Sequence, residues 1–278
     1  MTLKTSPKIS VVVATKNVEH TLQGCIDSFA MQTYPHKELV IIDGASTDAT
    51  ISIIKKNQKH IAYWESGPDR NLAHAWNKAL DHVTGQWILF LGADDRLHDS
   101  KVFENIEDCL KKAQSQRHLI CYGKVKLLDN KGEVVAIRGR PWSQARERLF
   151  IDNLHIHHQG VFHHRELFSR YGMLDEDFGF VGLDYELVIR YLKDNDASFC
   201  DVIITKARVG GLSWSPRGAI KGKMVMLRAA RKHGLRMKPG FYLKLLNAYI
   251  AWGLSFVMSE ERVTQFILRL KRLGFLKN

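Results

Sequence analysis

The stretch that decides the fold is Trp87-Ile88-Leu89-Phe90-Leu91-Gly92-Ala93-Asp94-Asp95. Its unbroken apolar run is typical of a strand that is buried on both faces of a sheet. The two adjacent carboxylates at its end repel each other, and a Mg²⁺ or Mn²⁺ ion held together with substrate phosphates would remove that repulsion. The stretch therefore predicts a metal site at Asp94 and Asp95. The alternative is a solvated turn in which one of these acids caps a helix.

The chain before this stretch alternates short apolar runs with helical segments. Residues 9–14, 38–43 and 61–64 are predicted strands, and residues 72–83 are a predicted helix. A turn over 44–48 is expected to lead into a helix capped by Ser46 or Thr47. This alternation predicts an α/β fold whose sheet is mostly parallel and has helices on both faces. Neither a dinucleotide-binding fingerprint nor a P-loop follows the first strand.

The chain after this stretch has less regular spacing. The predicted elements are a helix over 99–115, a β-hairpin over 120–137, strands over 160–164 and 198–205, a short helix over 166–171, a helix opened by Asp184, and helices over 218–233 and 241–273. We expect residues 1–215 to form the catalytic domain and residues 216–278 to form a basic, amphipathic helical extension.

Positive charge is concentrated near the carboxyl terminus. The formal net charge is +12, and residues 203–278 carry 16 Lys and Arg against Glu260 and Glu261, a net +14 that leaves −2 for the other 202 residues. A basic tail on a near-neutral body predicts an acidic partner such as an anionic lipid or a diphosphate. Nucleic acid is not expected, because the basic residues are not interleaved with aromatic ones.

Residues 241–258 are mostly apolar, but Lys244, Asn247 and Gly253 interrupt them. That is marginal for a membrane-spanning helix. With Lys and Arg on both flanks, the segment predicts an amphipathic helix that lies on an anionic membrane. The alternative is a helix packed on the domain or in a homodimer interface.

The four cysteines lie far apart and form no C-x-x-C pair. This spacing argues against a zinc site and a disulfide framework, and it favours the reducing cytosol. The first eight residues contain no apolar core of a secretory signal. We therefore expect a cytoplasmic protein that is peripheral on the inner face of the plasma membrane.

Acids recur where the early strands end. Asp43 and Asp69 follow the second and third predicted strands, and Asp94 and Asp95 follow the fourth. The carboxyl ends of parallel strands meet at one edge of a sheet, so these acids predict a nucleotide and metal site there. Asp43 and Asp69 can accept hydrogen bonds from a base or a ribose. Alternatively, Asp43 forms the turn before Gly44 and Asp69 is an ordinary loop acid.

Several ordered segments resemble family 2 glycosyltransferases of GT-A fold, and most closely the bacterial enzymes that build O-antigen, capsule or other exopolysaccharide. The resemblance spans roughly residues 8–215. The segments that carry it are 9–17 (ISVVVATKN), 32–34 (QTY), 38–48 (ELVIIDGASTD), 65–69 (ESGPD), 75–80 (AWNKAL), 84–85 (TG) and 92–95 (GADD).

The resemblance implies an inverting sugar transfer from a nucleotide-diphosphate sugar that depends on Mn²⁺ or Mg²⁺. The residues it implies for donor binding are Ala14, Thr15, Asn17, Asp43, Asp69, Arg70, Asn77 and Asp94. Asp94 and Asp95 stand at the family's DxD metal site. Gly92 departs from that pattern, because many members carry the first acid there, so the metal would have only two protein carboxylates.

An inverting transfer needs a general base for the acceptor hydroxyl. The resemblance implies that Asp184 is this base. Glu186 lies about 200° further round the same helix and is expected to face away. An N-cap carboxylate is the alternative role for Asp184.

Five histidines, at 155, 157, 158, 163 and 164, precede that helix without the spacing of a zinc site. The resemblance implies that His158 and Gln159 lie near the acceptor and the diphosphate. Strand alternation would turn His157 the other way. Arg217 is a further candidate for the diphosphate.

These observations predict a hexosyltransferase that moves a sugar from a UDP-, GDP- or TDP-sugar to a lipid-linked glycan. Two alternatives stay open. One is a metal-dependent nucleotidyltransferase acting on sugar phosphates, and the other is a non-catalytic basic binding module.

Overall fold

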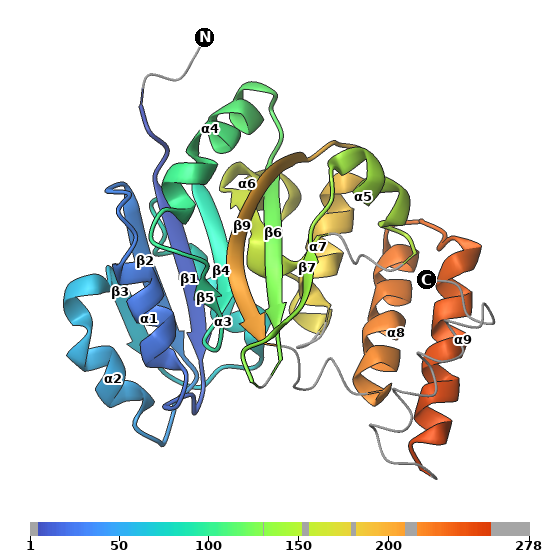
Figure 1. Cartoon of the computed structure of the whole chain (residues 1–278), viewed down its shortest axis with the longest axis horizontal. Coiled ribbons are helices and arrows are strands. Elements are labelled where there is room, and N and C mark those ends of the chain that lie inside the picture. Colours follow the sequence, from blue (N-terminus) through green and yellow to red (C-terminus); the bar gives the residue numbers. More distant parts are fainter. Residues whose placement is uncertain (1–4, 130, 152–155, 179–181, 209–215, 257–278) are drawn as a thin grey trace. The chain divides into compact units, whose positions relative to one another are not determined.

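The computed structural model describes residues 5–129, 131–151, 156–178, 182–208 and 216–256 (Figure 1). The chain divides into two compact units, one of residues 1–149 and 153–209 and the other of residues 150–152 and 210–278. The assignment of 1–215 as a catalytic domain and of 216–278 as an extension stays a prediction.

Nine strands of the described residues form one sheet in the first unit. They are β1 (Ile9–Thr15), β2 (Lys37–Asp43), β3 (Tyr63–Ser66), β4 (Trp87–Gly92), β5 (Arg96–Leu97), β6 (Ile120–Leu128), β7 (Val134–Arg138), β8 (Val161–His164) and β9 (Ser198–Arg208). The order is β3-β2-β1-β4-β8-β6-β9-β5, with β7 paired to β6. The first four strands run parallel, and β8 is antiparallel to both of its neighbours.

The helices of this unit are α1 (Leu22–Ala30), α2 (Thr50–Lys56), α3 (Leu72–Leu80), α4 (Val102–Ser115), α5 (Trp142–Arg148), α6 (Glu166–Tyr171) and α7 (Leu183–Leu192). Together with the parallel strands they confirm the predicted α/β fold with a mostly parallel sheet.

The central strand β4 is buried on both faces, as its composition predicts. Leu89 and Leu91 belong to a core cluster with residues of α1 and α4. On the opposite face, Phe90 stacks on Trp76 of α3 with ring centroids 4.6 Å apart and meets Phe168 of α6 edge-on. Because successive side chains of a strand alternate, one run of apolar residues holds helices on both faces.

The register brings the ends of the parallel strands to one edge. Thr15 pairs with Asp43, Asp43 with Ser66, and Ala14 with Gly92. The loops that follow these strands therefore leave the sheet side by side.

Some local predictions were wrong. Helix α2 begins at Thr50, and neither Ser46 nor Thr47 caps it, because the Ser46 hydroxyl bonds to Asp43 instead. Helix α4 begins at Val102 rather than at residue 99. The two-residue strand β5 and the helix α5 were not predicted, because neither is long enough to show a periodic pattern.

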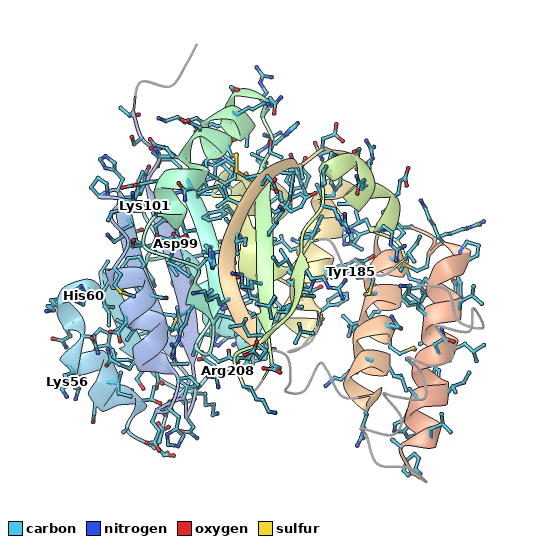
Figure 2. The ribbon with its side chains drawn as sticks, viewed as in Figure 1. Lys56, His60, Asp99, Lys101, Tyr185 and Arg208 are labelled. Atoms are coloured by element: carbon cyan, nitrogen blue, oxygen red, sulfur yellow. A yellow bond between two sulfur atoms is a disulfide. The ribbon has the colours of Figure 1, made fainter. Side chains whose placement is uncertain are left out.

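The structure joins Cys109 of α4 to Cys200 of β9 in a disulfide (Figure 2). This corrects the expectation that the cysteines are unpaired. The two residues are 91 positions apart in sequence, and they meet because α4 packs against β9. The other two cysteines, Cys25 and Cys121, are free and buried.

The second unit contains two long helices that pack against each other, α8 (Pro216–Lys232) and α9 (Pro239–Leu254). Phe241, Ala248 and Ala251 form the buried side of α9. No helix of the described residues is long and apolar enough to cross a membrane.

Candidate active site

The loops after β1 and β2 lock together at the sheet edge. Asn17 and Ala45 both have left-handed backbone conformations, with φ of 53° and 58°. The Asn17 side-chain oxygen accepts the Thr47 backbone N–H at 2.9 Å, and the Asn17 backbone N–H donates to the Ser46 hydroxyl at 2.9 Å. Non-glycine residues in this conformation are uncommon, and such strain concentrates at ligand sites.

Asp43 is fully buried at the end of β2. Its Oδ1 accepts hydrogen bonds from the hydroxyls of Thr15 (2.8 Å) and Ser46 (2.6 Å), and its Oδ2 accepts from the Ser46 backbone (2.9 Å) and the Ser66 hydroxyl (2.7 Å). Burial alone would raise the pKa of Asp43, but these hydrogen bonds outweigh it and lower the pKa. The carboxylate therefore organises three strand ends and stays charged.

Asp69 lies beside Gly44, where an added Cβ would come within 3.3 Å of its Oδ2. The Asp69 carboxylate faces two partners from α3, His74 Nδ1 at 3.1 Å and Lys78 Nζ at 2.8 Å. Lys78 also pairs with Glu65 at 3.0 Å. The structure thus brings Asp69 next to the Asp43 loop.

Arg70 and Asn77 are anchored to a distant segment. Arg70 pairs with Glu176 at 2.6 Å. The Asn77 amide group donates to the Leu174 carbonyl at 2.9 Å and accepts the Leu174 N–H at 3.0 Å. Asn71 adds a bond to the Glu176 carbonyl. In this structure both predicted donor-binding residues hold α3 and the loop before it against residues 174–176.

Asp94 and Asp95 converge above Gly92. A Cβ added to Gly92 would lie 2.8 Å from Asp94 Oδ1 and 2.8 Å from Asp95 Oδ2. The absence of a side chain at this position leaves room for both carboxylates to turn toward one point. The chain continues into β5 rather than a helix, so the helix-cap alternative for these acids is wrong.

Asp94 is exposed and Asp95 is buried. Burial, reinforced by the charge of Asp94, raises the pKa of Asp95 to about 8. No group of three or more His, Cys, Asp or Glu side chains in the described part of the chain is arranged to hold an ion. Two convergent carboxylates, one buried without a cation, nevertheless fit a divalent ion that takes its other ligands from a substrate.

The segment before β8 brings a histidine close to Asp184 of α7. His158 lies in a 3-10 turn, η2 (His158–Gly160), rather than in a strand, so the expected alternation with His157 does not apply. The Nδ1 of His158 is 4.0 Å from Asp184 Oδ2. Burial lowers the pKa of His158, while the charges of Asp184 and Asp94 act in the opposite direction. Asp94, His158 and Asp184 therefore share one site.

Helix α7 sets the direction of Asp184. Gly182 is the N-cap in a left-handed conformation, so the alternative of Asp184 as the N-cap is wrong. Glu186 is fully buried and pairs with Arg190 of the same helix. The prediction that Asp184 and Glu186 face different ways is confirmed.

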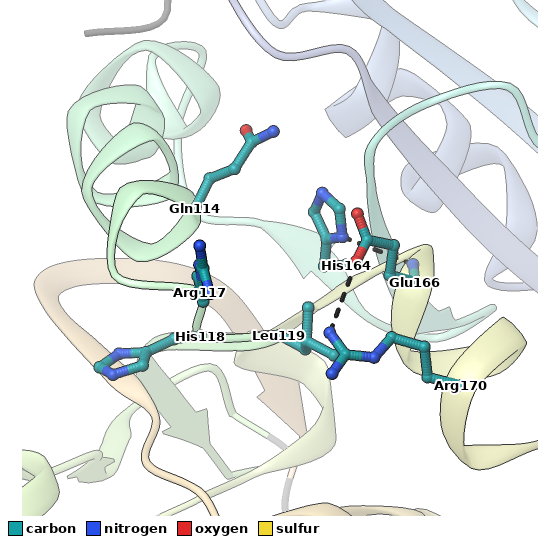
Figure 3. Close-up of a pocket in the computed structure, with 7 residues that line it drawn as sticks. All are labelled: Gln114, Arg117, His118, Leu119, His164, Glu166 and Arg170. Atoms are coloured by element: carbon teal, nitrogen blue, oxygen red, sulfur yellow. Dashed lines mark hydrogen bonds and ion pairs between the residues drawn. The ribbon is translucent and has the colours of Figure 1, made fainter. Parts of the chain in front are cut away.

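A cavity of about 280 Å³ opens at the opposite edge of the sheet (Figure 3). It is lined in part by Arg117, His164, Glu166 and Arg170. His164 pairs with Trp87 at the start of β4, whereas the acids follow the end of that strand. No predicted site residue lines this cavity. Arg217, the remaining candidate, is an exposed residue of α8 in the second unit.

Sequence reasoning missed the residues that hold the site together. Ser46, Ser66 and Lys78 contact the predicted acids, and although each lies in a segment that carries the family resemblance, nothing in the sequence pattern assigns it a partner. Glu176 was missed because it lies 99–106 positions from its partners.

Comparison with known proteins establishes the class to which this fold and site belong. The family model for glycosyl transferase family 2 matches residues 10–172, more than half of the chain. The chain belongs to this family, and the predicted recognition is confirmed.

Particular relatives sharpen this assignment. A PGL/p-HBAD biosynthesis glycosyltransferase of Mycobacterium tuberculosis is 29% identical over 243 residues, covering 80% of this chain and 91% of the relative. The putative teichuronic acid biosynthesis glycosyltransferase TuaG of Bacillus subtilis is 30% identical over 112 residues, 38% of this chain and 44% of that protein.

Solved structures share the fold. S. aureus TarS 1–349 in complex with UDP-GlcNAc superposes with a TM-score of 0.58 at 21% identity, covering 92% of this chain and 77% of that one. The mannosyltransferase PcManGT from Pyrobaculum calidifontis, in complex with GDP-Man and Mn²⁺, gives 0.63 at 18% identity over 99% and 82% of the two chains.

Proposed function

We propose that this glycosyltransferase inverts the anomeric centre as it moves one hexose from a nucleotide-diphosphate sugar to an acceptor hydroxyl. The observation that carries the proposal is the convergence of Asp94, His158 and Asp184. It supports a site in which Asp94 would face the metal and Asp184 would face the acceptor, with His158 interacting electrostatically with both.

The divalent ion would be held by Asp94 and Asp95. When bound, Mn²⁺ or Mg²⁺ neutralises the charge that develops on the leaving diphosphate. With only two protein carboxylates, the site would leave the remaining ligands of the ion to the donor phosphates. We therefore expect weak Mn²⁺ binding to the free protein, and tight binding without nucleotide would contradict this arrangement.

The base and ribose of the donor would lie over the ends of β1 and β2. Ala14 is half-buried between Ile42 and Gly92, and Asn17 shapes the loop above it. The Asp43 carboxylate already accepts four hydrogen bonds from neighbouring residues. It would therefore bind a nucleotide by accepting a hydrogen bond from the ligand in place of the one from the Ser66 hydroxyl. Asp69, Arg70 and Asn77 would border the sugar side.

UDP-, GDP- and TDP-sugars remain the candidate donors. Solved neighbours of this fold hold UDP-GlcNAc and GDP-Man, which supports a nucleotide-diphosphate sugar without selecting the nucleotide. Asp69 pairs with His74 and Lys78 of α3 beside the Asp43 loop, and we place donor selectivity there.

Asp184 would act as the general base. Its carboxylate takes the proton of the acceptor hydroxyl while that oxygen attacks the anomeric carbon, and the bond from this carbon to the diphosphate oxygen breaks on the opposite face. His158 faces Asp184 from 4.0 Å, which supports a role in placing the acceptor. Gln159 and Arg217 were assigned to the acceptor and diphosphate side from sequence.

The acceptor would be a lipid-linked glycan at an anionic membrane. Relatives named for PGL/p-HBAD and teichuronic acid biosynthesis support an acceptor that belongs to a larger glycan or glycolipid. The face of α9 opposite α8 exposes Tyr242, Leu243, Leu246, Tyr249 and Ile250. Residues 216–256 contain no acidic residue, so this unit suits an anionic surface on the cytoplasmic side.

A donor panel tests the proposal. Purified protein is melted with each UDP-, GDP- and TDP-sugar, with and without Mn²⁺, because a ligand of the native state raises the melting temperature. We expect one nucleotide class to stabilise the protein only when Mn²⁺ is present. If no donor shifts the melting temperature under either condition, the proposal fails.

A further inference from the structure

Asp95 is an unusual carboxylate for its burial. It is 4% exposed, yet no Lys, Arg or His of the described residues is among the groups that act on its carboxylate. The Gly92 backbone N–H donates to its Oδ2 at 3.1 Å, and its other donor is the side chain of Gln159. Buried carboxylates are normally paired with a cation or coordinate a metal, so two neutral donors leave this one incomplete.

The side-chain amide of Gln159 also lacks a hydrogen-bond partner at its oxygen in the described part of the chain. Its Oε1 is buried and has no hydrogen-bond partner among the described residues. Because that oxygen is unpaired, the contact with Asp95 is made by the amide nitrogen, which donates. A buried acceptor without a partner costs about 1–3 kcal/mol, and such groups in native structures often mark an unseen water or ion.

The backbone around Gln159 is tightly held. The Gly160 N–H donates to the His157 carbonyl at 2.9 Å. A Cβ on Gly160 would come within 3.0 Å of Val125 Cγ2 and 3.2 Å of the Gly123 carbonyl oxygen, both on β6. Since η2 also packs on β4, the backbone that carries Gln159 is held beside the strand that leads to Asp95.

We propose that Gln159 is a positioning residue of the metal site rather than an acceptor contact. Its amide nitrogen holds Asp95 in the orientation that faces Asp94, and its Oε1 supplies a third protein oxygen to the shell of the divalent cation. Carbonyl oxygens suit Mg²⁺ and Mn²⁺ as carboxylates do. The proposal rests on the proposed function and accounts for a site in which Gly92 replaces an acid.

The test is Mn²⁺ affinity, measured from the electron paramagnetic resonance signal of free Mn²⁺ at saturating UDP, GDP or TDP. Gln159→Leu removes both the nitrogen and the oxygen of the side-chain amide. Gln159→Asn keeps the amide but shortens the side chain by one methylene, which draws the amide away from Asp95. Both should weaken Mn²⁺ binding about 10- to 100-fold, the effect typical of partners that orient metal ligands. Gln159→Glu keeps an oxygen but loses the amide donor to Asp95, so it should bind Mn²⁺ more weakly than wild type and clearly more tightly than Gln159→Leu.

Controls separate this role from folding. Gln116→Leu, at an exposed glutamine at the end of α4, should leave the affinity unchanged. Gln159→Asn keeps the residue polar and guards against misfolding of the leucine variant. Wild-type affinity in Gln159→Leu or Gln159→Asn would overturn the inference, and loss in Gln159→Glu equal to that in Gln159→Leu would remove Oε1 as a ligand. A wild-type protein that binds no Mn²⁺ with nucleotide would overturn the proposed function as well.

Discussion

At the scale of single residues, the strand ends nominated the acids at the sheet edge and the resemblance to family 2 glycosyltransferases nominated Asp184, but neither predicted what surrounds these acids. Asp184 and Glu186 are two positions apart on α7, and the sequence alone predicts that only one can face the site. The four-fold hydrogen bonding of Asp43 could not be predicted, because Thr15 and Ser66 reach it from other strands. Which donors surround a buried carboxylate depends on tertiary packing.

Replacing Asp184 with Asn should separate binding from transfer. The amide keeps the shape of the side chain but cannot take a proton, and a positioned base contributes about 10²- to 10⁴-fold to rate. We expect sugar transfer to fall by about that factor while donor affinity, measured by calorimetry, stays within two-fold. Near wild-type kcat in this variant would remove Asp184 as the base.

Gly92→Ala tests the convergence of the two metal-site acids. The added methyl group would lie 2.8 Å from an oxygen of each carboxylate, so both must turn away. We expect Mn²⁺ affinity in the presence of nucleotide to fall about ten-fold, as when metal ligands are misoriented. The matched control Gly253→Ala adds its Cβ to open space on α9 and should change nothing.

At the scale of elements, long apolar strands and helices were predictable because burial imposes a period on their sequence. β4, α3 and α7 were all predicted near their observed positions. The short β5 and α5 were not, and the start of α2 was misplaced because Ser46 serves the Asp43 loop instead of the helix. Whether the Ser46 hydroxyl caps the helix or bonds to Asp43 depends on the tertiary neighbours of the turn, which the sequence pattern does not specify.

The amino ends of β1, β2 and β4 are joined by Glu38, a buried carboxylate at the other edge of the sheet. It accepts hydrogen bonds from Lys8, Ser10 and Thr84. Burial raises the pKa of Glu38, but these bonds outweigh it and lower the pKa to about 2. A lowered carboxyl pKa stabilises the fold above the unfolded value near 4.5, and this stability is lost as the pH falls toward 2.

Glu38→Gln should therefore destabilise the protein at neutral pH and much less in acid. After allowance for the part-exposed Lys8, we expect a loss of about 2 kcal/mol at pH 7. The free energy of unfolding in urea, measured from pH 7 down to pH 2.5, should show the difference from wild type shrinking below pH 4.5. A difference that is constant with pH would contradict this role.

At the scale of the whole molecule, the uneven charge of the chain predicted a separate basic extension. The tail helices α8 and α9 pack on each other, and α9 leaves a broad apolar face exposed. The sequence could not distinguish packing from membrane contact, because one helix can use opposite faces for both.

Leu246→Glu on α9 should reduce binding to vesicles that contain phosphatidylglycerol. Loss of one buried leucine, about 1.5–3 kcal/mol, corresponds to at least about ten-fold in affinity. Co-sedimentation should also weaken at high salt and with purely zwitterionic vesicles. Val134→Glu, at an exposed apolar position of β7, is the matched control. Equal binding by both variants and wild type would contradict membrane contact through α9.

The most direct test of the central claim is product analysis of the donor reaction. UDP-, GDP- and TDP-sugars are incubated with the protein, a lipid extract as acceptor source and either Mn²⁺ or EDTA, and the phosphorus products are followed by NMR. We predict that at least one donor releases a nucleoside diphosphate with Mn²⁺, and that EDTA and Asp184→Asn each abolish the release. No turnover of any donor, release of pyrophosphate, or turnover that persists in EDTA would contradict the account.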